Sequence, residues 1–184
     1  GRLLVRETYG QATLAGLVRL TRAVIVVTFL AEAAGAAILA ARFWSQMPPA
    51  RAVYFGIFHS ISAFCNAGFD LFGDSLVRYA SDFVVVPTMG LLIIAGGIGF
   101  VVIKDLLEAW RTRDSRLTLH SRTVLRVTAW LVGLGTITVF AIEYNNPATL
   151  GRLPLAGKVL SAWFHAVTPR TAGFNTLATA MLRQ

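Results

Sequence analysis

The chain has 184 residues, of which 55% are hydrophobic and 14% are charged, with a mean hydropathy of +0.64. A soluble domain usually carries about 25% charged residues, so this composition indicates lipid as the main solvent. The net charge of +8 does not favour nucleic-acid binding, because the basic residues lie beside hydrophobic runs and form no basic motif. A single cysteine excludes an internal disulfide framework.

The first predicted elements are a cytoplasmic segment over residues 1–22 and a membrane-spanning helix over residues 23–41. The predicted helix holds 19 residues, and its only charged residue is Glu32. At 1.5 Å per residue such a helix is roughly 30 Å long, which matches the hydrocarbon core of a bilayer. A carboxylate at mid-membrane costs about 3 kcal/mol on insertion scales. We therefore expect Glu32 to face protein and support the structure through a hydrogen bond, with ion coordination as the alternative.

The stretch that follows, residues 58–72, is too polar to cross a bilayer and too apolar for an ordinary surface loop; it reads FHSISAFCNAGFDLF. Residues 53–64 can form about three helical turns, roughly 18 Å, which is half a membrane. Such a helix must return, and irregular backbone is tolerated at that depth only where it is buried in protein or lines water. Gly68 suits backbone angles that other residues avoid. The stretch predicts a pore loop, where carbonyl groups and the negative end of a helix dipole favour a cation.

A second spanning helix is predicted over residues 83–103, which carry no charge over 21 positions. Its glycines are interpreted as sites of close packing or of a helix irregularity, with gating flexibility as the alternative; they are Gly90, Gly96, Gly97 and Gly99. A basic cytoplasmic loop over residues 106–122 follows. By the positive-inside rule, this loop and the basic N-terminal segment face the cytoplasm, and the pore loops face outward.

The third hydrophobic run covers residues 127–142 and begins 104 residues after the first. A second half-polar stretch at residues 164–177 reads FHAVTPRTAGFNTL, and its AGF lies 105 residues after the AGF of the first stretch. The chain therefore contains a repeat. It holds one complete helix–pore-loop–helix unit over residues 23–105, and the first helix and pore loop of a truncated unit over residues 123–184. The predicted fold class is an all-α membrane protein, potassium-channel-like, with one complete and one partial unit.

At these residues the chain resembles the Trk/Ktr/HKT superfamily of cation translocators, and most closely the membrane subunits of bacterial Ktr potassium uptake systems. The resemblance rests on five pieces of sequence, which are GQATLAGLVRLTR, FHSISAFCNAGF, AGGIGFVVIKDL, EYNNPATLG and HAVTPRTAGFNTL. Members of this family have four such units in one polypeptide, arranged around a single pathway. The resemblance implies that this chain corresponds to the second unit and the opening half of the third. The gating loop of the third unit then lies outside it.

The resemblance also implies the ion-binding residues and the partners. Potassium, with sodium as the alternative ion, would pass a selectivity filter lined by backbone carbonyl oxygens. Its residues here would be Asn66, Ala67, Gly68, Phe69, Thr171, Ala172, Gly173 and Phe174. The full-length subunit would be a multi-pass homodimer in the inner (plasma) membrane, gated by cytoplasmic nucleotide-binding regulatory subunits. The nucleotide would bind to those partners alone, and neither a cofactor nor a transition-metal site is expected in this chain.

Four further residues near the pore loops need an interpretation. Arg170 is expected to support the second loop from behind the filter, paired with an acidic residue such as Glu143 or Asp70. His59 and His165 lack the spacing of zinc ligands, so each is expected to hydrogen-bond or pack along its pore helix. Cys65 is expected to be a small buried side chain.

Two other functional classes remain open at this point. A secondary ion-coupled transporter also has broken helices at mid-membrane, but many such folds show inverted repeats, whereas these repeats run in the same direction. A non-conducting membrane scaffold would use the glycine turns only for packing. An enzyme is not expected, because the sequence shows no phosphate-binding loop and no nucleophile–base constellation.

Overall fold

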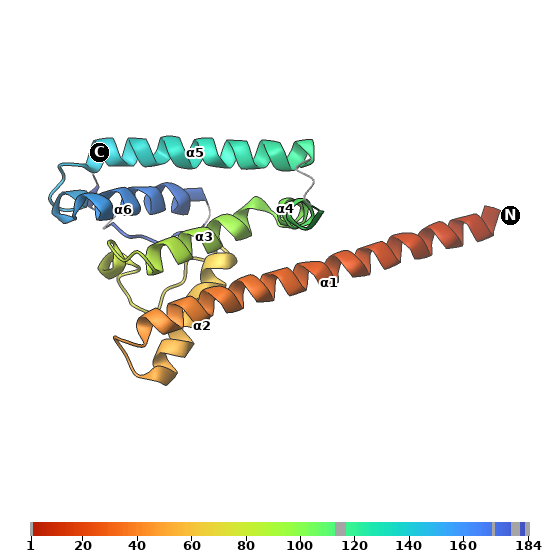
Figure 1. The fold of residues 1–184 in the computed structure, drawn as a ribbon, viewed down its shortest axis with the longest axis horizontal. Coiled ribbons are helices and arrows are strands. Elements are labelled where there is room, and N and C mark those ends of the chain that lie inside the picture. The colour runs from red at the N-terminus through yellow and green to blue at the C-terminus, as the bar shows by residue number, and fades with distance from the viewer. Residues whose placement is uncertain (1, 113–116, 171, 178–180, 183–184) are drawn as a thin grey trace.

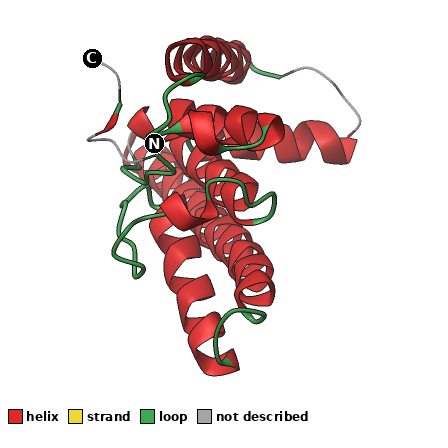
Figure 2. Ribbon diagram, turned by 90° about the vertical axis from the view of Figure 1, so that its left-hand side faces the viewer, coloured by secondary structure: helices red, strands yellow, loops and turns green. Residues whose placement is uncertain are grey.

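A computed structural model describes the chain except for residues 1, 113–116, 171, 178–180 and 183–184. The described residues form helices and loops without β-strands (Figures 1 and 2). The α-helices are α1 (Arg2–Phe43), α2 (Pro49–Phe64), α3 (Val85–Ile98), α4 (Phe100–Thr112), α5 (Leu119–Glu143) and α6 (Leu155–Val167). The 3-10 turns are η1 (Val77–Tyr79), η2 (Leu150–Arg152) and η3 (Thr168–Arg170). The all-α class is therefore confirmed.

The short helices α2 and α6 begin at prolines and end at the two half-polar stretches. Pro48 precedes the first residue of α2, and Pro154 precedes the first residue of α6. Pro49 is itself the first residue of α2, a position that suits proline because its nitrogen needs no hydrogen-bond partner there and its φ is fixed. With 16 and 13 residues, the helices are about 24 and 20 Å long. Each is too short to cross a bilayer, and α2 starts four residues earlier than the sequence predicts.

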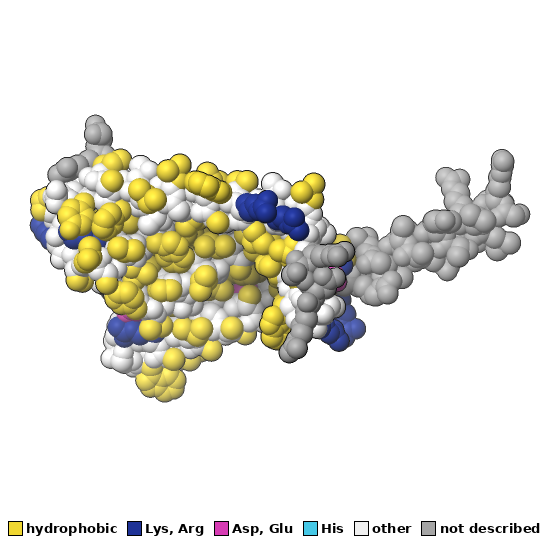
Figure 3. All heavy atoms as spheres, turned by 45° about the horizontal axis from the view of Figure 1, so that its top comes forward, with side chains coloured by type: hydrophobic (Ala, Val, Ile, Leu, Met, Phe, Trp, Pro, Cys, Tyr) yellow, Lys and Arg dark blue, Asp and Glu magenta, His cyan; other side chains and the backbone are white. Residues whose placement is uncertain are grey.

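Two helices are long and apolar enough to span a membrane. They are the Leu20–Phe43 part of α1, with 24 residues, and α5, with 25 residues. Both are mostly exposed in this chain, and hydrophobic side chains cover much of the face in Figure 3. Lys and Arg side chains appear mainly near the two ends of that face. This distribution is typical of a protein that meets lipid in its middle zone.

The second predicted span is not a straight helix, which corrects the sequence prediction for residues 83–103. The chain bends by 104° between α3 and α4. Gly99 lies at the break with a φ of 88°, a conformation that disfavours any residue with a side chain. Its carbonyl oxygen then accepts hydrogen bonds from the N–H groups of Val102 and Ile103, at 3.2 and 3.3 Å. The expected helix irregularity at these glycines is therefore a sharp bend.

The helices form two similar pairs with α3 packed between them. α1 packs mainly on α2, α5 packs mainly on α6, and α3 contacts α1, α2 and α6. Gly56 allows the first pair to approach closely, because a Cβ there would lie 2.7 Å from the carbonyl oxygen of Ala36. In Figure 1, α1 and α5 run in the same direction. The N-terminal end of α1 lies toward the same end of the molecule as α4 and the start of α5, as the positive-inside interpretation requires.

One hydrophobic cluster joins both pairs. Its largest fully buried side chains include Phe43 of α1, Met89 of α3 and Phe164 of α6. Phe174, from the loop after α6, is also fully buried in this cluster. The core therefore fixes the loops that follow α2 and α6 relative to each other.

Candidate functional site

The first candidate filter segment leaves the end of α2 through a tight turn. The N–H groups of Cys65, Asn66 and Ala67 donate to carbonyl groups in the last turn of α2, at 2.8 to 3.1 Å. Asn66 and Gly68 then take positive φ angles of 54° and 75°. Asparagine and glycine adopt this region more readily than other residues. The result is an abrupt change of direction over residues 66–68.

The second candidate segment follows α6 and η3. The N–H groups of Ala172 and Gly173 both donate to the carbonyl oxygen of Thr168, at 3.0 and 3.4 Å. Gly173 has a φ of 72°, nearly the value of its counterpart Gly68. Thr171 lies outside the described residues, as does the side chain of Arg170, which the sequence placed behind this loop.

The two turns meet, although their glycines are 105 positions apart in the sequence. A Cβ built on Gly68 would collide with the carbonyl oxygen of Ala172. A Cβ built on Gly173 would lie 3.9 Å from the Cα of Gly68. The backbones of the two segments are therefore in direct contact, just beyond the ends of α2 and η3. This contact requires glycine at position 68 on steric grounds as well as for its backbone angle.

The matched phenylalanines behave differently. The side chain of Phe69 is 69% exposed, whereas that of Phe174 is fully buried. Ala67 and Gly173 are exposed as well. Within the described part of the chain, no hydrogen bond is accepted by the carbonyl oxygens of Ala67, Gly68 or Gly173. These oxygens are hard neutral ligands of the kind that alkali cations accept in place of water.

Side chains from α2 and the backbone of α3 hold the first segment from behind. Ser62 Oγ donates to the carbonyl oxygen of Phe69 at 2.8 Å. Asn66 Nδ2 lies 3.2 Å from the carbonyl oxygen of Phe64 and 3.4 Å from that of Ile93 in α3. Gly96 of α3 packs so closely on this turn that a Cβ there would collide with the Phe64 carbonyl oxygen. The segment is thus fixed on both its helix side and its α3 side.

A pair of hydrogen bonds ties the loop after the first segment to the second segment. The N–H of Leu76 donates to the carbonyl oxygen of Asn175 at 2.9 Å, and the N–H of Asn175 donates to Ser75 Oγ at 2.9 Å. We call this pair the Ser75–Asn175 clamp. Ser75 itself has a positive φ of 55°. Sequence reasoning missed the clamp, because nothing in the local pattern predicts a partner 100 residues away.

The two pore-helix histidines have different surroundings. His59 is fully buried; its Nδ1 lies 2.7 Å from the carbonyl oxygen of Phe55, and its Nε2 accepts from the N–H of Leu71 at 3.4 Å. These contacts require the tautomer with the proton on Nδ1. The ring also stacks on Phe72 with a centroid distance of 4.6 Å. His59 therefore packs and hydrogen-bonds along its helix, as expected, while Nδ1 of His165 is buried without a partner among the described residues.

Glu32 and Cys65 lie together beside the first turn. Glu32 is 8% exposed, its main-chain oxygen accepts from Ser60 Oγ at 2.7 Å, and its Oε1 lies 3.8 Å from Cys65 Sγ. Cys65 is exposed, so the prediction of a buried side chain is wrong. The reason is its place at the C-cap of α2, where the chain leaves the helix.

The two acids considered as partners of Arg170 have partners of their own. Asp70 Oδ1 accepts from the N–H groups of Phe72 and Gly73 at 2.7 and 2.8 Å. Glu143 is buried, and its Oε2 accepts from Asn146 Nδ2 at 2.6 Å and Thr149 Oγ1 at 2.5 Å. Each carboxylate thus stabilises a turn, the first after α2 and the second after α5.

A salt bridge joins the last turn of α1 to the residues just before α3. Arg42 Nη2 lies 2.7 Å from Asp82 Oδ2. Asp82 Oδ1 also accepts from the N–H groups of Val84 and Val85, at 2.9 and 3.0 Å. Burial alone would raise the pKa of Asp82, but these N–H groups and Arg42 outweigh it and hold the pKa below its ordinary value. The carboxylate is therefore charged at neutral pH and joins the two helices.

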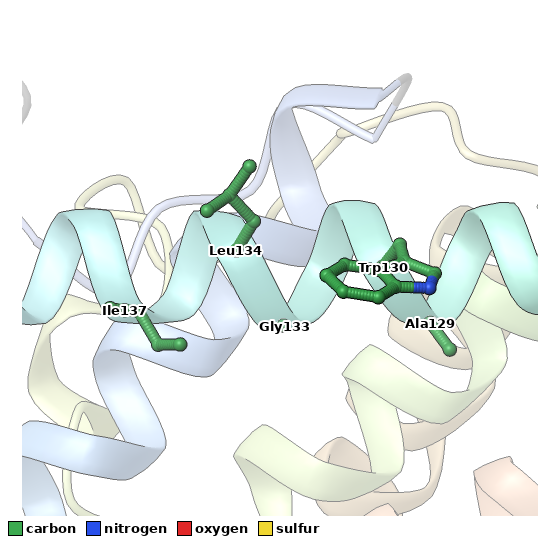
Figure 4. Close-up of a pocket in the computed structure, with 5 residues that line it drawn as sticks. All are labelled: Ala129, Trp130, Gly133, Leu134 and Ile137. Carbon is green, nitrogen blue, oxygen red and sulfur yellow. The ribbon is translucent and has the colours of Figure 1, made fainter.

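A further hollow lies on an exposed side of α5 (Figure 4). It has a volume of about 310 Å³ and is lined by Ala129, Trp130, Gly133, Leu134 and Ile137. All five residues belong to one helix, and the lining is almost wholly apolar. The hollow is thus a shallow feature of an exposed helix face and contributes nothing to the turns described above.

Comparison with known proteins identifies the family. A family model described as TrkH, cation transport protein, matches residues 2–184. The chain is 38% identical over 183 residues to Ktr system potassium uptake protein B of Bacillus subtilis (strain 168), covering 100% of this chain and 41% of that protein. It is 38% identical over 174 residues to a protein of the same name from Vibrio alginolyticus, covering 95% and 38%.

A third relative carries a broader name. The chain is 35% identical over 176 residues to potassium/sodium uptake protein NtpJ of Enterococcus hirae, covering 96% of this chain and 38% of that protein. The chain therefore spans about two-fifths of the length of these relatives. With its apolar spanning helices, it is part of a membrane protein, and it belongs to the TrkH family of cation transport proteins, which are transporters and not enzymes.

Proposed function

We propose that this chain is part of a potassium ion uptake translocation subunit that conducts cations through a filter lined by backbone carbonyl oxygens. The main observation in support is that Gly68 of one repeat lies against Ala172 and Gly173 of the next. Two segments matched in sequence meet beyond the ends of two helices that are too short to cross a bilayer. Relatives named as potassium uptake proteins support potassium as the ion, and the name of NtpJ adds sodium as a second.

The proposed filter residues act mainly through their main chain. Asn66, Ala67, Gly68 and Phe69 from one unit, and Thr171, Ala172, Gly173 and Phe174 from the next, supply carbonyl oxygens that replace the water shell of the ion. The negative dipole ends of α2 and α6 add a favourable potential for a cation. No carboxylate ring is needed, so selectivity depends on how rigidly the segments are held. Glu32 and Arg170 support the segments without contacting the ion.

The complete pathway requires more chain than these 184 residues. In the proposal, residues 23–105 form one complete unit, residues 123–184 open the next, and further units of the full-length subunit complete the ring. Residues 1–22 and 106–122 face the cytoplasm. The full-length subunit is a homodimer in the inner (plasma) membrane, and cytoplasmic nucleotide-binding subunits gate it. The alternatives of a secondary ion-coupled transporter and a non-conducting scaffold are less favoured, because the repeats are parallel and their turns converge.

Rubidium uptake through the full-length protein tests the proposal. Gly68→Ser introduces a side chain into the backbone contact with Ala172 and should abolish uptake or remove the preference for potassium over sodium. Gly73→Ser is the matched control, because Gly73 also has a positive φ, 83°, but a Cβ there meets nothing within 4 Å. It should retain uptake and selectivity. Unchanged uptake and selectivity in Gly68→Ser, at equal expression, would refute the filter assignment.

A further inference from the structure

The helix after the Gly99 bend, α4, has one apolar and one polar side. At 100° per residue, most of its large apolar side chains gather on one side, with Phe100 at its edge and Val101 apart from it; they are Val102, Ile103, Leu106, Leu107 and Trp110. The opposite side carries Lys104, Asp105, Glu108, Arg111 and Thr112. A helix of this kind covers a boundary between an apolar and a polar medium.

Hydrogen bonds to the start of α5 fix the depth of α4. Asp105 Oδ2 accepts from Thr118 Oγ1 and from Ser121 Oγ, both at 2.5 Å. Thr118 is the N-cap of α5 and accepts the N–H of Ser121 at 3.3 Å. α5 has 25 residues, about 37 Å, which exceeds the roughly 30 Å hydrocarbon core. Arg122 and Arg126 occupy its first two turns and are exposed, so this end of α5, and α4 with it, lies at the headgroup layer.

The apolar side of α4 is only partly covered by protein. Val102 is fully buried, but Leu107 is 48% exposed and Trp110 is 83% exposed. Both ends of α4 continue into apolar membrane helices, α3 through the 104° bend and α5 through residues 113–118. α4 is therefore held at the membrane surface and runs across the direction of α3.

We propose that α4 is an interfacial helix whose occupant is the phospholipid bilayer surface at the start of α5, on the cytoplasmic side in the proposed topology. Leu106, Leu107 and Trp110 insert below the headgroups. Lys104 and Arg111, both exposed, meet the phosphates and water above them. Tryptophan and basic residues are favoured at this boundary. The Asp105 bonds to Thr118 and Ser121 anchor the helix to the start of α5. This role is independent of ion conduction.

Spin labels on the full-length protein test the orientation. Cys65, and any cysteine elsewhere in the subunit, is replaced by serine, and single cysteines are introduced by Leu106→Cys or Leu107→Cys. Glu108→Cys is the matched control on the polar side. In vesicles of phosphatidylcholine and phosphatidylglycerol, the ratio of oxygen to nickel-chelate collisions should be at least about threefold higher at positions 106 and 107 than at position 108. Equal ratios would overturn the proposal in favour of an aqueous helix. Labels reached by neither reagent at positions 106 and 107 would overturn it in favour of a protein partner.

A second measurement avoids labels on α4. Full-length wild type and Trp110→Phe are compared in vesicles whose phospholipids carry bromine near the headgroup end of the acyl chains. Wild type should show an additional quenched emission that Trp110→Phe lacks, because the other tryptophans are common to both proteins. If the emission lost with Trp110 is not quenched by brominated lipid, the indole is not in the bilayer and the proposal is wrong.

Discussion

Gly68 and Ala172 are packed backbone against backbone, so that a side chain at position 68 would collide with the carbonyl oxygen of Ala172. The two residues belong to different repeats and are 104 positions apart. Gly173, next to Ala172, has a similar positive φ to that of Gly68, but a Cβ added at Gly173 would have more space. The contact is therefore asymmetric, even though the two segments have matching sequences.

This asymmetry predicts unequal effects of two glycine substitutions. Gly173→Ala introduces a positive-φ strain of about 1–2 kcal/mol, because the nearest atom to its new Cβ is 3.9 Å away. Gly68→Ala adds a backbone collision to the same strain. In the full-length protein, Gly68→Ala should lower thermal stability and rubidium uptake more than Gly173→Ala does. Equal losses in both variants would show that the backbone contact has no effect of its own.

The Ser75–Asn175 clamp predicts a selectivity change without loss of folding. Ser75→Ala removes the acceptor of the Asn175 N–H, at a cost of about 1 kcal/mol. Because this bond holds the second segment, the ratio of potassium to sodium uptake should fall, which a purely structural role would leave unchanged. Ser45→Ala is the control, since the hydrogen bonds of Ser45 Oγ among the described residues stay within its own turn, with Arg42. An unaltered ion preference in Ser75→Ala would contradict the prediction.

Neighbouring glycines of α3 provide a test of close packing on the first segment. Gly96→Ala places a Cβ against the Phe64 carbonyl oxygen and 2.9 Å from Asn66 Nδ2. Overpacking of this kind costs typically about 1–3 kcal/mol. Gly97→Ala is the matched control, because its nearest neighbour, Asn66 Nδ2, is 4.0 Å away. Thermal unfolding in detergent should show a lower midpoint for Gly96→Ala and little change for Gly97→Ala, and the reverse order would contradict the packing.

The pKa of Asp82 predicts a pH dependence of stability. The pKa of Asp82 in the folded state lies below its ordinary value of 3.8, so the ionised carboxylate stabilises the folded state at pH values above 3.8. This stabilisation is lost as the pH falls through the pKa of the folded state. Asp82→Asn removes the charge and should cost about 1 kcal/mol at pH 7, measured by unfolding in detergent, with the difference from wild type shrinking toward pH 3.

The exposed pair of Asp74 and Arg78 is the control for this effect. Their side chains are 45% and 50% exposed and lie 2.9 Å apart. Exposed pairs contribute little because water and salt screen them, so Asp74→Asn should change stability by less than about 0.5 kcal/mol. A larger effect of Asp74→Asn than of Asp82→Asn would refute the assignment.

Hydropathy and spacing determined the class of the protein and most of its elements. Runs of apolar residues predicted the first and third long helices, because chain length and the cost of burying charge in lipid are properties of local sequence. The repeat was also visible, since AGF recurs after 105 residues. Even the backbone angle of Gly68 could be anticipated, because glycine is the residue that tolerates it.

Contacts between distant segments were decided only by the tertiary structure. The sequence could not show that Gly99 lies at a 104° bend and not inside a straight helix. The direction of the chain after Gly99 depends on how α4 is held by Thr118 and Ser121, which are distant in the sequence. The exposure of Cys65 follows from the direction in which the chain leaves α2. The meeting of Gly68 with Ala172, and the Ser75–Asn175 clamp, arise because the shared core orients both loops toward each other. A local pattern specifies which backbone turns are possible, and packing between repeats selects where they meet.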